Sequence, residues 1–432
     1  MRVLIFSAKT GGGHMRTSQA IQKIIMERDP ESTVEIVDAL KYISPVFDKA
    51  ITEGYFQMAT KTPAVFGAFY RVSDRENTFS SLFSKMNAQF GKRLIPKIKK
   101  YNPDIIIAAH PFVAMMLSNL KEKYTFPSPV ICLLTDFAPH RTYINEKIDA
   151  YVVATEEMVS QITQEYHTDK TIIYPLGIQV DPKFYSLQKM YNKLDLKKEM
   201  KLNPDLPVIL VMAGSFGVTD VLKIYQSIVE IDTEFQIIVV TGRNKRLYSA
   251  FKKLLSKTED SEIVIEVEPE EDPFESIEIP NFSKNAVIEN VHKTASKTVQ
   301  KLKFRKNVIQ AKPTKLLYFV NDIERYMYIS DLIVTKPGGL TVSESLITGL
   351  PLAVFKAIPG QEDENAKYLF EHNMAIILDK HGNAGNQIKE LLENPEKLSS
   401  MKHSCQDFAK NKSPDQFYNL LVSFSEKKAK NI

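Results

Sequence analysis

Residues 331–345 read Asp331-Leu332-Ile333-Val334-Thr335-Lys336-Pro337-Gly338-Gly339-Leu340-Thr341-Val342-Ser343-Glu344-Ser345, an apolar run followed by a Pro-Gly-Gly turn and a helical pattern. This order predicts a strand that turns sharply into a helix running to Gly349. The unpaired N–H groups at the start of such a helix suit an anion, for example a diphosphate. Glu344 lies one turn into the helix, where its carboxylate can accept hydrogen bonds from a ribose. Taken alone, Pro-Gly-Gly is typical of a plain tight turn.

A second glycine-rich turn, near the N-terminus, strengthens the first interpretation. Thr10-Gly11-Gly12-Gly13-His14 follows a strand-like run and precedes a helical pattern. It has neither the Gly-Lys-Ser/Thr of a P-loop nor the G-x-G-x-x-G of a dinucleotide fingerprint. His14 lies at the mouth of a strand–turn–helix unit, where the active sites of open α/β sheets are found. Because the pKa of histidine suits proton transfer near neutrality, we expect His14 to be a general base; the alternative is a capping or packing role.

Composition excludes several classes of protein. At 432 residues the chain is too long for one core and predicts two domains. Its hydrophobic content of 44% and charged content of 25% are those of an ordinary soluble globular protein. Cys132 and Cys405 give no disulfide framework, the chain starts directly with a strand rather than a signal peptide, and no apolar run approaches ~20 residues. A net charge of +4 does not argue for nucleic acid. We therefore expect a cytoplasmic protein without a nucleic-acid partner.

Strand-like and helix-like segments alternate in two series, separated by a break at Pro175–Pro182. This alternation predicts an α/β architecture of two doubly wound, Rossmann-like domains that face each other across a cleft. We assign residues 1–178 to the first domain, 179–413 to the second, and 414–432 to a helix that packs back on the first. The expected strands are Val3–Ser7, Val34–Ala39, Asp104–Ala109, Val130–Thr135, Tyr151–Ala154, Val208–Ala213, Gln236–Thr241, Leu316–Val320, Leu332–Thr335, Leu352–Phe355 and Ala375–Leu378.

The chain resembles the GT-B fold glycosyltransferases of the group that contains MurG, the peptidoglycan lipid II synthase. Within this group it is most similar to the bacterial diacylglycerol glucosyltransferases and the plant monogalactosyldiacylglycerol synthases. The resemblance lies in short motifs that follow one another in family order from the first strand almost to the last. They are Gly11–His14, Leu134–Phe137, Val153–Glu157, Ala213–Gly217, Thr241–Asn244, Thr335–Glu344 and Pro359–Asn365.

In such enzymes the second domain binds a UDP-sugar. The resemblance implies that the helix starting at Gly338-Gly339 meets the diphosphate and that Glu344 meets the ribose. The backbone around Phe319-Val320 would hold uracil, and the helix that opens with Gln361 would reach the sugar hydroxyls. The implied donor-binding residues are Gly13, Gly214, Ser215, Arg243, Phe319, Val320, Gly338, Gly339, Leu340, Thr341, Glu344, Gln361, Glu362 and Asn365.

The resemblance also implies an inverting single displacement. His14 would take the proton of an acceptor hydroxyl while that oxygen attacks the anomeric carbon, giving a β-glycoside from an α-linked donor. Asp136 is the second expected catalytic residue, and Asp136 and His110 are candidates for orienting His14 or the acceptor. The chain has no Asp-x-Asp pair to bind a divalent ion at the diphosphate. We therefore expect no metal and no other cofactor, with helix dipoles and backbone N–H groups stabilising the leaving UDP.

The acceptor side is expected in the segment from Lys41 to Tyr101, which has eleven Lys or Arg against four acids and many interleaved aromatics. This mixture suits an anionic bilayer surface. It also suits RNA, or a solvated basic surface over an aromatic core. Since the resemblance implies a lipid acceptor, we expect peripheral association with the inner face of the cell membrane. The residues expected to contact acceptor or membrane are Phe66, Tyr70, Lys92, Arg93 and His110.

The expected reaction moves a hexose from a UDP-sugar to the 3-hydroxyl of 1,2-diacylglycerol, forming a β-glycosyl diacylglycerol for membrane glycolipid synthesis. UDP-glucose is the favoured donor and UDP-galactose the second candidate. Two alternatives stay open: a MurG-like transferase acting on a polyprenyl-linked sugar, and a non-catalytic UDP-sugar-binding sensor. A charged insertion between Lys257 and Lys315 interrupts the family pattern and has no assigned role.

Overall fold

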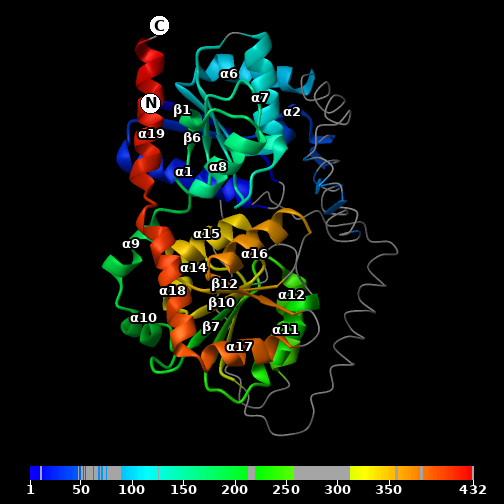
Figure 1. Ribbon diagram of the computed structural model, residues 1–432, viewed down its shortest axis with the longest axis vertical. Coiled ribbons are helices and arrows are strands. Elements are labelled where there is room, and N and C mark those ends of the chain that lie inside the picture. The colour runs from blue at the N-terminus through cyan, green and yellow to red at the C-terminus, as the bar shows by residue number, and fades with distance from the viewer. Residues whose placement is uncertain are drawn as a thin grey trace.

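Two parallel six-stranded sheets, each covered by helices, lie end to end along the long axis of the molecule (Figure 1). This computed structural model describes residues 1–9, 12–46, 48, 49, 52, 54, 62, 67, 68, 70, 71, 74, 89–124, 126–212, 219–256, 312–355, 359–379 and 383–430. The arrangement confirms the expected α/β fold of two doubly wound domains.

The first sheet has the strand order β2-β1-β3-β4-β5-β6, with every neighbouring pair parallel. The order reverses between β1 and β3, so the crevice outside their carboxyl ends is the switch point where ligands bind in such sheets. The strands are β1 (Arg2–Ser7), β2 (Thr33–Asp38), β3 (Ile105–Ala108), β4 (Val130–Leu133), β5 (Ala150–Val152) and β6 (Ile173–Tyr174). The main helices are α1 (Gly13–Arg28), α2 (Ala39–Ile43), α6 (Ile95–Tyr101), α7 (Pro111–Lys123) and α8 (Glu156–Glu165).

The second sheet has the order β12-β11-β10-β7-β8-β9, also all parallel. Its switch point lies between β7 and β10. The strands are β7 (Val208–Met212), β8 (Gln236–Val240), β9 (Thr314–Leu317), β10 (Leu332–Thr335), β11 (Leu352–Phe355) and β12 (Ala375–Leu378). The helices are α9 (Lys183–Met190), α10 (Lys193–Glu199), α11 (Thr219–Val229), α12 (Lys245–Leu255), α14 (Ile323–Ile329), α15 (Gly339–Ile347), α16 (Gln361–Glu371), α17 (Ala384–Leu392) and α18 (Pro395–Lys410).

Continuous apolar runs form the central strands because helices cover both faces of each sheet. Every residue of β3, β4, β8, β10 and β11 is buried. Helix α1 shows the complementary helical pattern: Ala20, Ile21, Ile24 and Ile25 are buried on one face. The continuous apolar runs of the strands differ clearly from the one-sided apolar pattern of the helices, so the alternation of strands and helices can be predicted from the sequence.

Two strand predictions were wrong in detail. The chain between β5 and Pro175 was not expected to contain a strand, yet Ile173–Tyr174 forms the edge strand β6. It is only two residues long and runs directly into Pro175, so no alternating pattern marks it. The strand expected at Leu316–Val320 begins earlier, at Thr314, and ends at Leu317. The polar start of β9 is buried because Thr314 and Lys315 both find hydrogen-bond partners there.

The last helix, α19 (Pro414–Lys430), crosses back to the first domain (Figure 1). Phe417, Leu421 and Phe424 pack with Val3 and Ile5 of β1. The assignment of residues 414–432 to this helix, and the two domain boundaries, stay predictions. Among the described helices, none combines the length and hydropathy needed to cross a bilayer.

Candidate active site

His14 lies in the first turn of α1, beyond the carboxyl end of β1. Gly12 caps the helix with a φ of 83°, a left-handed conformation that glycine adopts without steric cost. The His14 Nδ1 lies 3.2 Å from the hydroxyl oxygen of Thr135, and that oxygen lies 3.2 Å from the hydroxyl of Tyr143. The ring of His110 meets the His14 ring edge to face, with centroids 4.7 Å apart. Since His14 follows β1 and His110 follows β3, the pair flanks the switch point of the first sheet.

Both imidazoles are held in the neutral form. Burial lowers the pKa of His14 to about 4, and a hydrogen bond with the backbone of Ala109 only partly opposes this. Burial, with a smaller contribution from His14, also holds the pKa of His110 well below its usual range. The His110 Nδ1 accepts a hydrogen bond of 3.2 Å from the Phe112 N–H at the start of α7. Above about pH 4 His14 is therefore neutral, which is the protonation state that a general base requires.

The second glycine-rich turn lies directly opposite. Helix α15 begins at Gly339 without a side-chain cap, so its first N–H groups remain available to an anion. Gly339 is pressed against the first domain, where an added Cβ would overlap the carbonyl oxygen of Thr135. The Leu340 Cβ lies 4.0 Å from the position of a Cβ on Gly13. The amino-terminal ends of α1 and α15 therefore meet across the domain boundary.

Glu344 is 6% exposed and lies within reach of Arg16 from α1. Burial raises the pKa of Glu344 to about 7; Arg16 opposes the shift, while Asp181 and Glu324 add to it. A carboxylate at this depth is ready to take up hydrogen-bond donors, because few waters solvate it. Glu344 as the ribose ligand stays a prediction.

Asn365 joins the two domains. It is fully buried: its amide nitrogen donates to Asp136 Oδ1 and to the Pro337 carbonyl, each at 3.0 Å, and its amide oxygen accepts from the Phe137 N–H at 2.8 Å. The Gln361 amide lies 3.5 Å from the other oxygen of Asp136. Burial raises the pKa of Asp136 to about 6, with the Asn365 hydrogen bond opposing. Contacts of Gln361 and Asn365 with sugar hydroxyls stay predictions, and in this arrangement both side chains face Asp136.

Lys336 is a cation at this site for which the sequence predicted no role. Its ammonium forms an ion pair of 2.5 Å with Glu362. It also lies 3.7 Å from the position of a Cβ on Gly338, beside the start of α15. A lysine next to a helix amino terminus strengthens the attraction for a diphosphate. Glu362 as a sugar ligand stays a prediction.

The expected uracil side lies at the carboxyl ends of β8 and β9. The Arg243 guanidinium lies 4.7 Å from the centre of the Phe319 ring, and Val320 is half-buried. Thr341 is half-buried in the first turn of α15. Arg243 follows β8, and Phe319 and Val320 follow the edge strand β9, so these residues lie beside the switch point rather than at it. Their contacts with uracil and the donor stay predictions.

The remaining assignments divide into placed and unplaced residues. Tyr70 lies at the domain boundary, where its ring is 2.8 Å from a Cβ placed on Gly360. Lys92 and Arg93 are exposed on the far side of the first domain, and the Arg93 guanidinium donates to the Ile43 carbonyl at 2.6 Å. Phe66, Gly214, Ser215 and residues 257–311 of the insertion lie outside the described residues.

Thr135, Tyr143 and Arg16 were missed by the sequence analysis. Asp136 was expected to orient His14, but in the described structure the hydroxyl of its neighbour Thr135 contacts the imidazole. The available signal for Thr135 is its place in the Leu134–Phe137 motif, directly before Asp136 and just beyond the end of β4. A catalytic role of Asp136 stays a prediction.

Two family descriptions match the chain, one in each domain. Residues 14–180 match the family described as monogalactosyldiacylglycerol (MGDG) synthase. Residues 275–417 match the glycosyltransferase family 28 C-terminal domain. The chain is a glycosyltransferase with the GT-B fold.

Relatives of this glycosyltransferase match it over nearly their whole length. It is 26% identical over 408 residues to the processive diacylglycerol beta-glucosyltransferase of Bacillus pumilus, covering 93% of this chain and 90% of the relative. It is 24% identical over 410 residues to the Bacillus subtilis protein of the same name, covering 94% and 91%.

Solved structures share the fold of this glycosyltransferase. MurG of Acinetobacter baumannii superposes with a TM-score of 0.58 at 12% identity, covering 98% of this chain and 99% of that chain. The UDP-GlcNAc 2-epimerase of Neisseria meningitidis superposes with a TM-score of 0.54 at 12% identity, covering 98% and 100%. Because a transferase and an epimerase both share the fold, the fold alone does not fix the reaction.

The pH dependence of donor binding tests Glu344. The pKa of Glu344 is raised to about 7, so the carboxylate that ribose hydroxyls prefer predominates only above that pH. We expect the affinity for UDP-glucose to rise with pH through about 7. In Glu344→Gln the affinity should be about 10–100-fold lower at pH 8, the usual effect of losing a hydrogen bond to a charge, and independent of pH.

Titration calorimetry without acceptor, between pH 5.5 and 8.5, measures this. Glu390→Gln, an exposed position on α17, is the matched control and should follow the wild type. A Glu344→Gln variant with the wild-type affinity and pH profile would remove Glu344 from the donor site.

Proposed function

We propose that this glycosyltransferase moves a hexose from a UDP-sugar, UDP-glucose in the first place and UDP-galactose in the second, to the 3-hydroxyl of 1,2-diacylglycerol. The product would be a β-glycosyl diacylglycerol for membrane glycolipids. The observation that carries the proposal is the neutral His14 facing the amino terminus of α15 across the domain boundary. The diacylglycerol glucosyltransferase names of the relatives support the choice of acceptor.

The proposed reaction is a single displacement. The acceptor oxygen attacks the anomeric carbon of the donor while its proton passes to His14. The bond between the anomeric carbon and the diphosphate oxygen breaks, and UDP leaves with that electron pair. Attack from the face opposite the leaving group converts an α-linked donor into a β-linked product.

The chain's own groups would stabilise the departing UDP. The N–H groups at the start of α15 and the Lys336 ammonium beside Gly338 lie where negative charge would develop. Preorganised donors of this kind stabilise a transition state more than water does, because they need no reorganisation. We propose that the reaction uses no metal, since the sequence has no Asp-x-Asp pair and these groups supply the positive charge.

A transfer assay tests the proposal. Purified protein is incubated with diacylglycerol vesicles and labelled UDP-glucose or UDP-galactose, with and without EDTA, and the lipids are separated. We expect a labelled glycolipid, formed faster from UDP-glucose and unaffected by EDTA. Label only on a polyprenyl-linked sugar acceptor would favour the MurG-like alternative, and UDP-sugar binding without transfer would favour the sensor. Loss of activity in EDTA that Mg²⁺ restores would contradict the metal-free mechanism.

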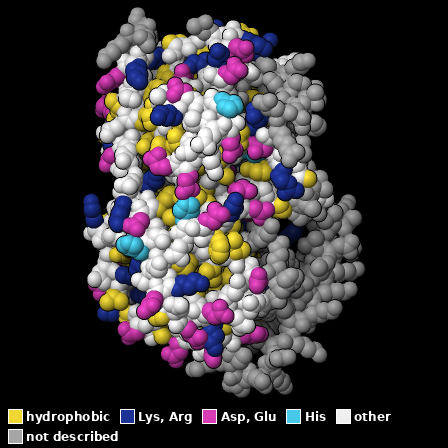
Figure 2. All heavy atoms as spheres, viewed as in Figure 1, with side chains coloured by type: hydrophobic (Ala, Val, Ile, Leu, Met, Phe, Trp, Pro, Cys, Tyr) yellow, Lys and Arg dark blue, Asp and Glu magenta, His cyan; other side chains and the backbone are white. Residues whose placement is uncertain are grey.

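We also propose that the first domain docks on an anionic membrane surface. Lys92, Lys99 and Lys100 are exposed around α6, at the end of the molecule away from the second domain (Figure 1). On the face in Figure 2, acidic and basic side chains are intermixed, and Lys and Arg lie along this upper end. Lys97 and Arg93 are engaged within the protein, Lys97 with Glu35 and Arg93 with the Ile43 carbonyl, so they are poorer membrane ligands.

Vesicle flotation across a salt series tests the membrane surface. Binding to anionic vesicles should weaken as salt rises, because a Debye length of about 8 Å at physiological ionic strength screens the attraction. Neutralising Lys92, Lys99 and Lys100 with glutamine should reduce binding at low salt by about tenfold or more, at on the order of 1 kcal/mol for each lysine. The same change at Lys198, Lys252 and Lys253, exposed on the second domain, is the control. Equal binding of both triple variants would make this basic end a plain solvated surface.

A further inference from the structure

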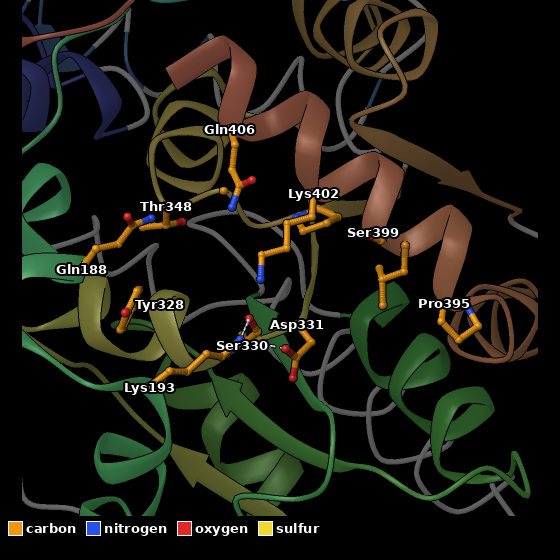
Figure 3. A pocket seen from close by; sticks show the side chains of 13 residues that line it. Gln188, Lys193, Tyr328, Ser330, Asp331, Thr348, Pro395, Ser399, Lys402 and Gln406 are labelled. Atoms are coloured by element: carbon orange, nitrogen blue, oxygen red, sulfur yellow. Dashed lines mark hydrogen bonds and ion pairs between the residues drawn. The ribbon is translucent and has the colours of Figure 1, made fainter. Parts of the chain in front are cut away.

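A cavity of about 520 Å³ lies in the C-terminal domain, at the opposite end of the sheet from α15's first turn (Figure 3). Its walls come from α9, α10 and α18, the end of α14 with the turn to β10, and the turn between α15 and β11. Residues Ser330, Asp331 and Pro351 immediately precede β10 and β11, which places the cavity at the amino ends of these strands. The proposed reaction uses only the carboxyl ends, so this cavity has no role in it.

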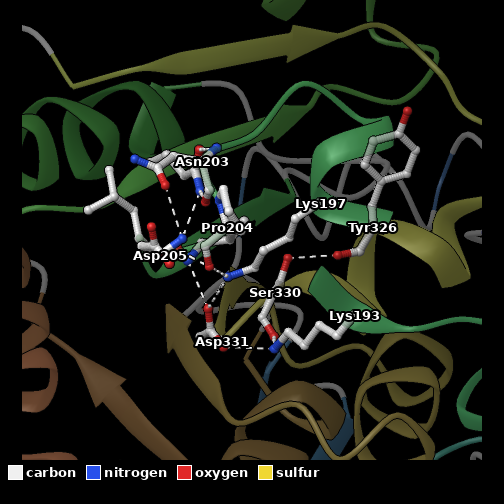
Figure 4. A network of polar contacts seen from close by, with 11 residues as sticks. Lys193, Lys197, Asn203, Pro204, Asp205, Tyr326, Ser330 and Asp331 are labelled. Carbon is white, nitrogen blue, oxygen red and sulfur yellow. Dashed lines mark hydrogen bonds and ion pairs between the residues drawn. The ribbon is translucent and has the colours of Figure 1, made fainter. Parts of the chain in front are cut away.

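The acid in the cavity wall is already neutralised. Asp331 forms ion pairs with Lys193 at 2.7 Å and Lys197 at 3.6 Å, and accepts from the Val208 N–H at 2.9 Å (Figure 4). Lys193 also donates to the Ser330 carbonyl at 3.0 Å. Helix α14 ends beside this carbonyl, and the negative end of a helix dipole opposes anion binding. Lys193 covers that negative end.

Lys402 is the second cation of the cavity wall, and its side chain is exposed to solvent. Its side chain reaches from α18 into the middle of the cavity, toward Lys193 and Asp331 (Figure 3). Lys402 makes no hydrogen bond or ion pair with any residue that the structure describes. Burial and the neighbouring Lys193 lower the pKa of Lys402, with Asp331 opposing. An anion between the two ammonium groups would relieve their repulsion.

The rest of the wall offers uncharged polar groups. Gln188 and Gln406 present side-chain amides, and Ser399 presents a hydroxyl. Such groups pair with sugar hydroxyls rather than with a bare ion. The volume lies within the usual range for metabolite sites, about 300–1,000 Å³, and exceeds what inorganic phosphate fills.

The cavity also touches the last turn of the donor-binding helix. The Thr348 hydroxyl donates to the carbonyls of Glu344 at 3.1 Å and Ser345 at 2.9 Å. Gly349 follows with a φ of 68°, and a Cβ there would lie 2.9 Å from the Gln406 side chain. Helix α15 thus links the cavity at one end to the proposed diphosphate site at the other, about 13 Å away at 1.5 Å per residue.

We propose that this cavity binds a small phosphorylated polyol, such as a hexose phosphate, with its phosphate between Lys402 and Lys193. Occupation of the cavity fixes the carboxyl end of α15 and thereby changes the affinity of the donor site for UDP. The coupling rests on the proposed function, because it needs α15 to hold the donor.

Calorimetry with glucose 6-phosphate, glycerol 3-phosphate and inorganic phosphate, in the presence of UDP, tests the site. We expect glucose 6-phosphate to bind most tightly, and Lys402→Met to weaken it at least about tenfold. Lys397→Met, an exposed lysine on the same helix, is the matched control and should bind like the wild type. Wild-type affinity in Lys402→Met would overturn the proposal. So would competitive displacement by UDP, or inorganic phosphate binding as tightly as the sugar phosphate.

A second titration separates the site from the coupling. Saturating glucose 6-phosphate should shift the UDP affinity of the wild type by roughly fivefold or more, and the shift should vanish in Lys402→Met. An unchanged UDP affinity would overturn the coupling. Both titrations measure binding rather than transfer. Their results can therefore be interpreted even if the diacylglycerol assay detects no product.

Discussion

Replacing His14 with alanine is expected to lower turnover by roughly 10²–10⁴ while leaving UDP affinity nearly unchanged. The imidazole is neutral, contacts Thr135 and His110, and lies opposite the start of α15. Among the described neighbours, His110 is a poor substitute as proton acceptor. Burial lowers its pKa, and its Nδ1 already accepts a hydrogen bond from the Phe112 N–H at the start of α7. Removing His14 therefore removes the proton acceptor without disturbing the groups that hold UDP.

Steady-state transfer rates and UDP titrations on the same preparations measure this effect. His403→Ala, an exposed histidine on α18, is the matched control and should keep full turnover. Near-normal turnover in His14→Ala would exclude the general-base role and direct attention to Asp136, whose pKa is raised to about 6.

The second large effect is expected from Gly339→Ala. An added Cβ at Gly339 overlaps the Thr135 carbonyl oxygen, and a Cβ has no rotamer that avoids it. The two domains must then move apart, which displaces His14 from the donor. A displacement of about 1 Å between reacting groups can lower the rate about 10²-fold. UDP affinity should change little, since alanine preserves the N–H groups at the start of α15.

Gly338→Ala is the matched control for this prediction. A Cβ at Gly338 has its nearest neighbour at 3.7 Å, the flexible end of Lys336, and the backbone φ of −75° suits alanine. We expect Gly338→Ala to keep most of the turnover that Gly339→Ala loses. Equal turnover in Gly339→Ala and the wild type would contradict the close approach of Gly339 to Thr135 during catalysis.

Most of the fold was readable from the sequence because parallel strands buried on both faces appear as unbroken apolar runs. Val208–Met212 and Leu352–Phe355 are examples. The exceptions have tertiary causes. β6 is a two-residue edge strand that exists only because β5 pairs with it. β9 begins with Thr314 and Lys315, and the Lys315 ammonium donates to the Met200 carbonyl at 3.3 Å, a contact that the local sequence pattern does not indicate.

The candidate site likewise contains residues that a local motif predicts and residues whose contacts depend on the fold. His14 and the α15 turn were predictable because glycine-rich turns after strands have a local signature. The roles of Thr135 and Lys336 become visible only in the folded domains, because their partners His14 and Glu362 lie 121 and 26 residues away in the sequence. Asn365 shows the limit most clearly. Its motif indicates a sugar ligand, whereas its partners in the structure are Asp136, Phe137 and Pro337, two of them more than two hundred residues away.

The anomeric configuration of the lipid product is the most direct test of an inverting transfer to diacylglycerol with His14 as base. Protein, diacylglycerol vesicles and UDP-glucose are incubated, and the purified glycolipid is examined by proton NMR. We expect β-glucosyl diacylglycerol from the α-linked donor. An α-linked product would contradict the single displacement at His14, and the absence of any glycosyl diacylglycerol from either UDP-glucose or UDP-galactose would contradict the proposed acceptor.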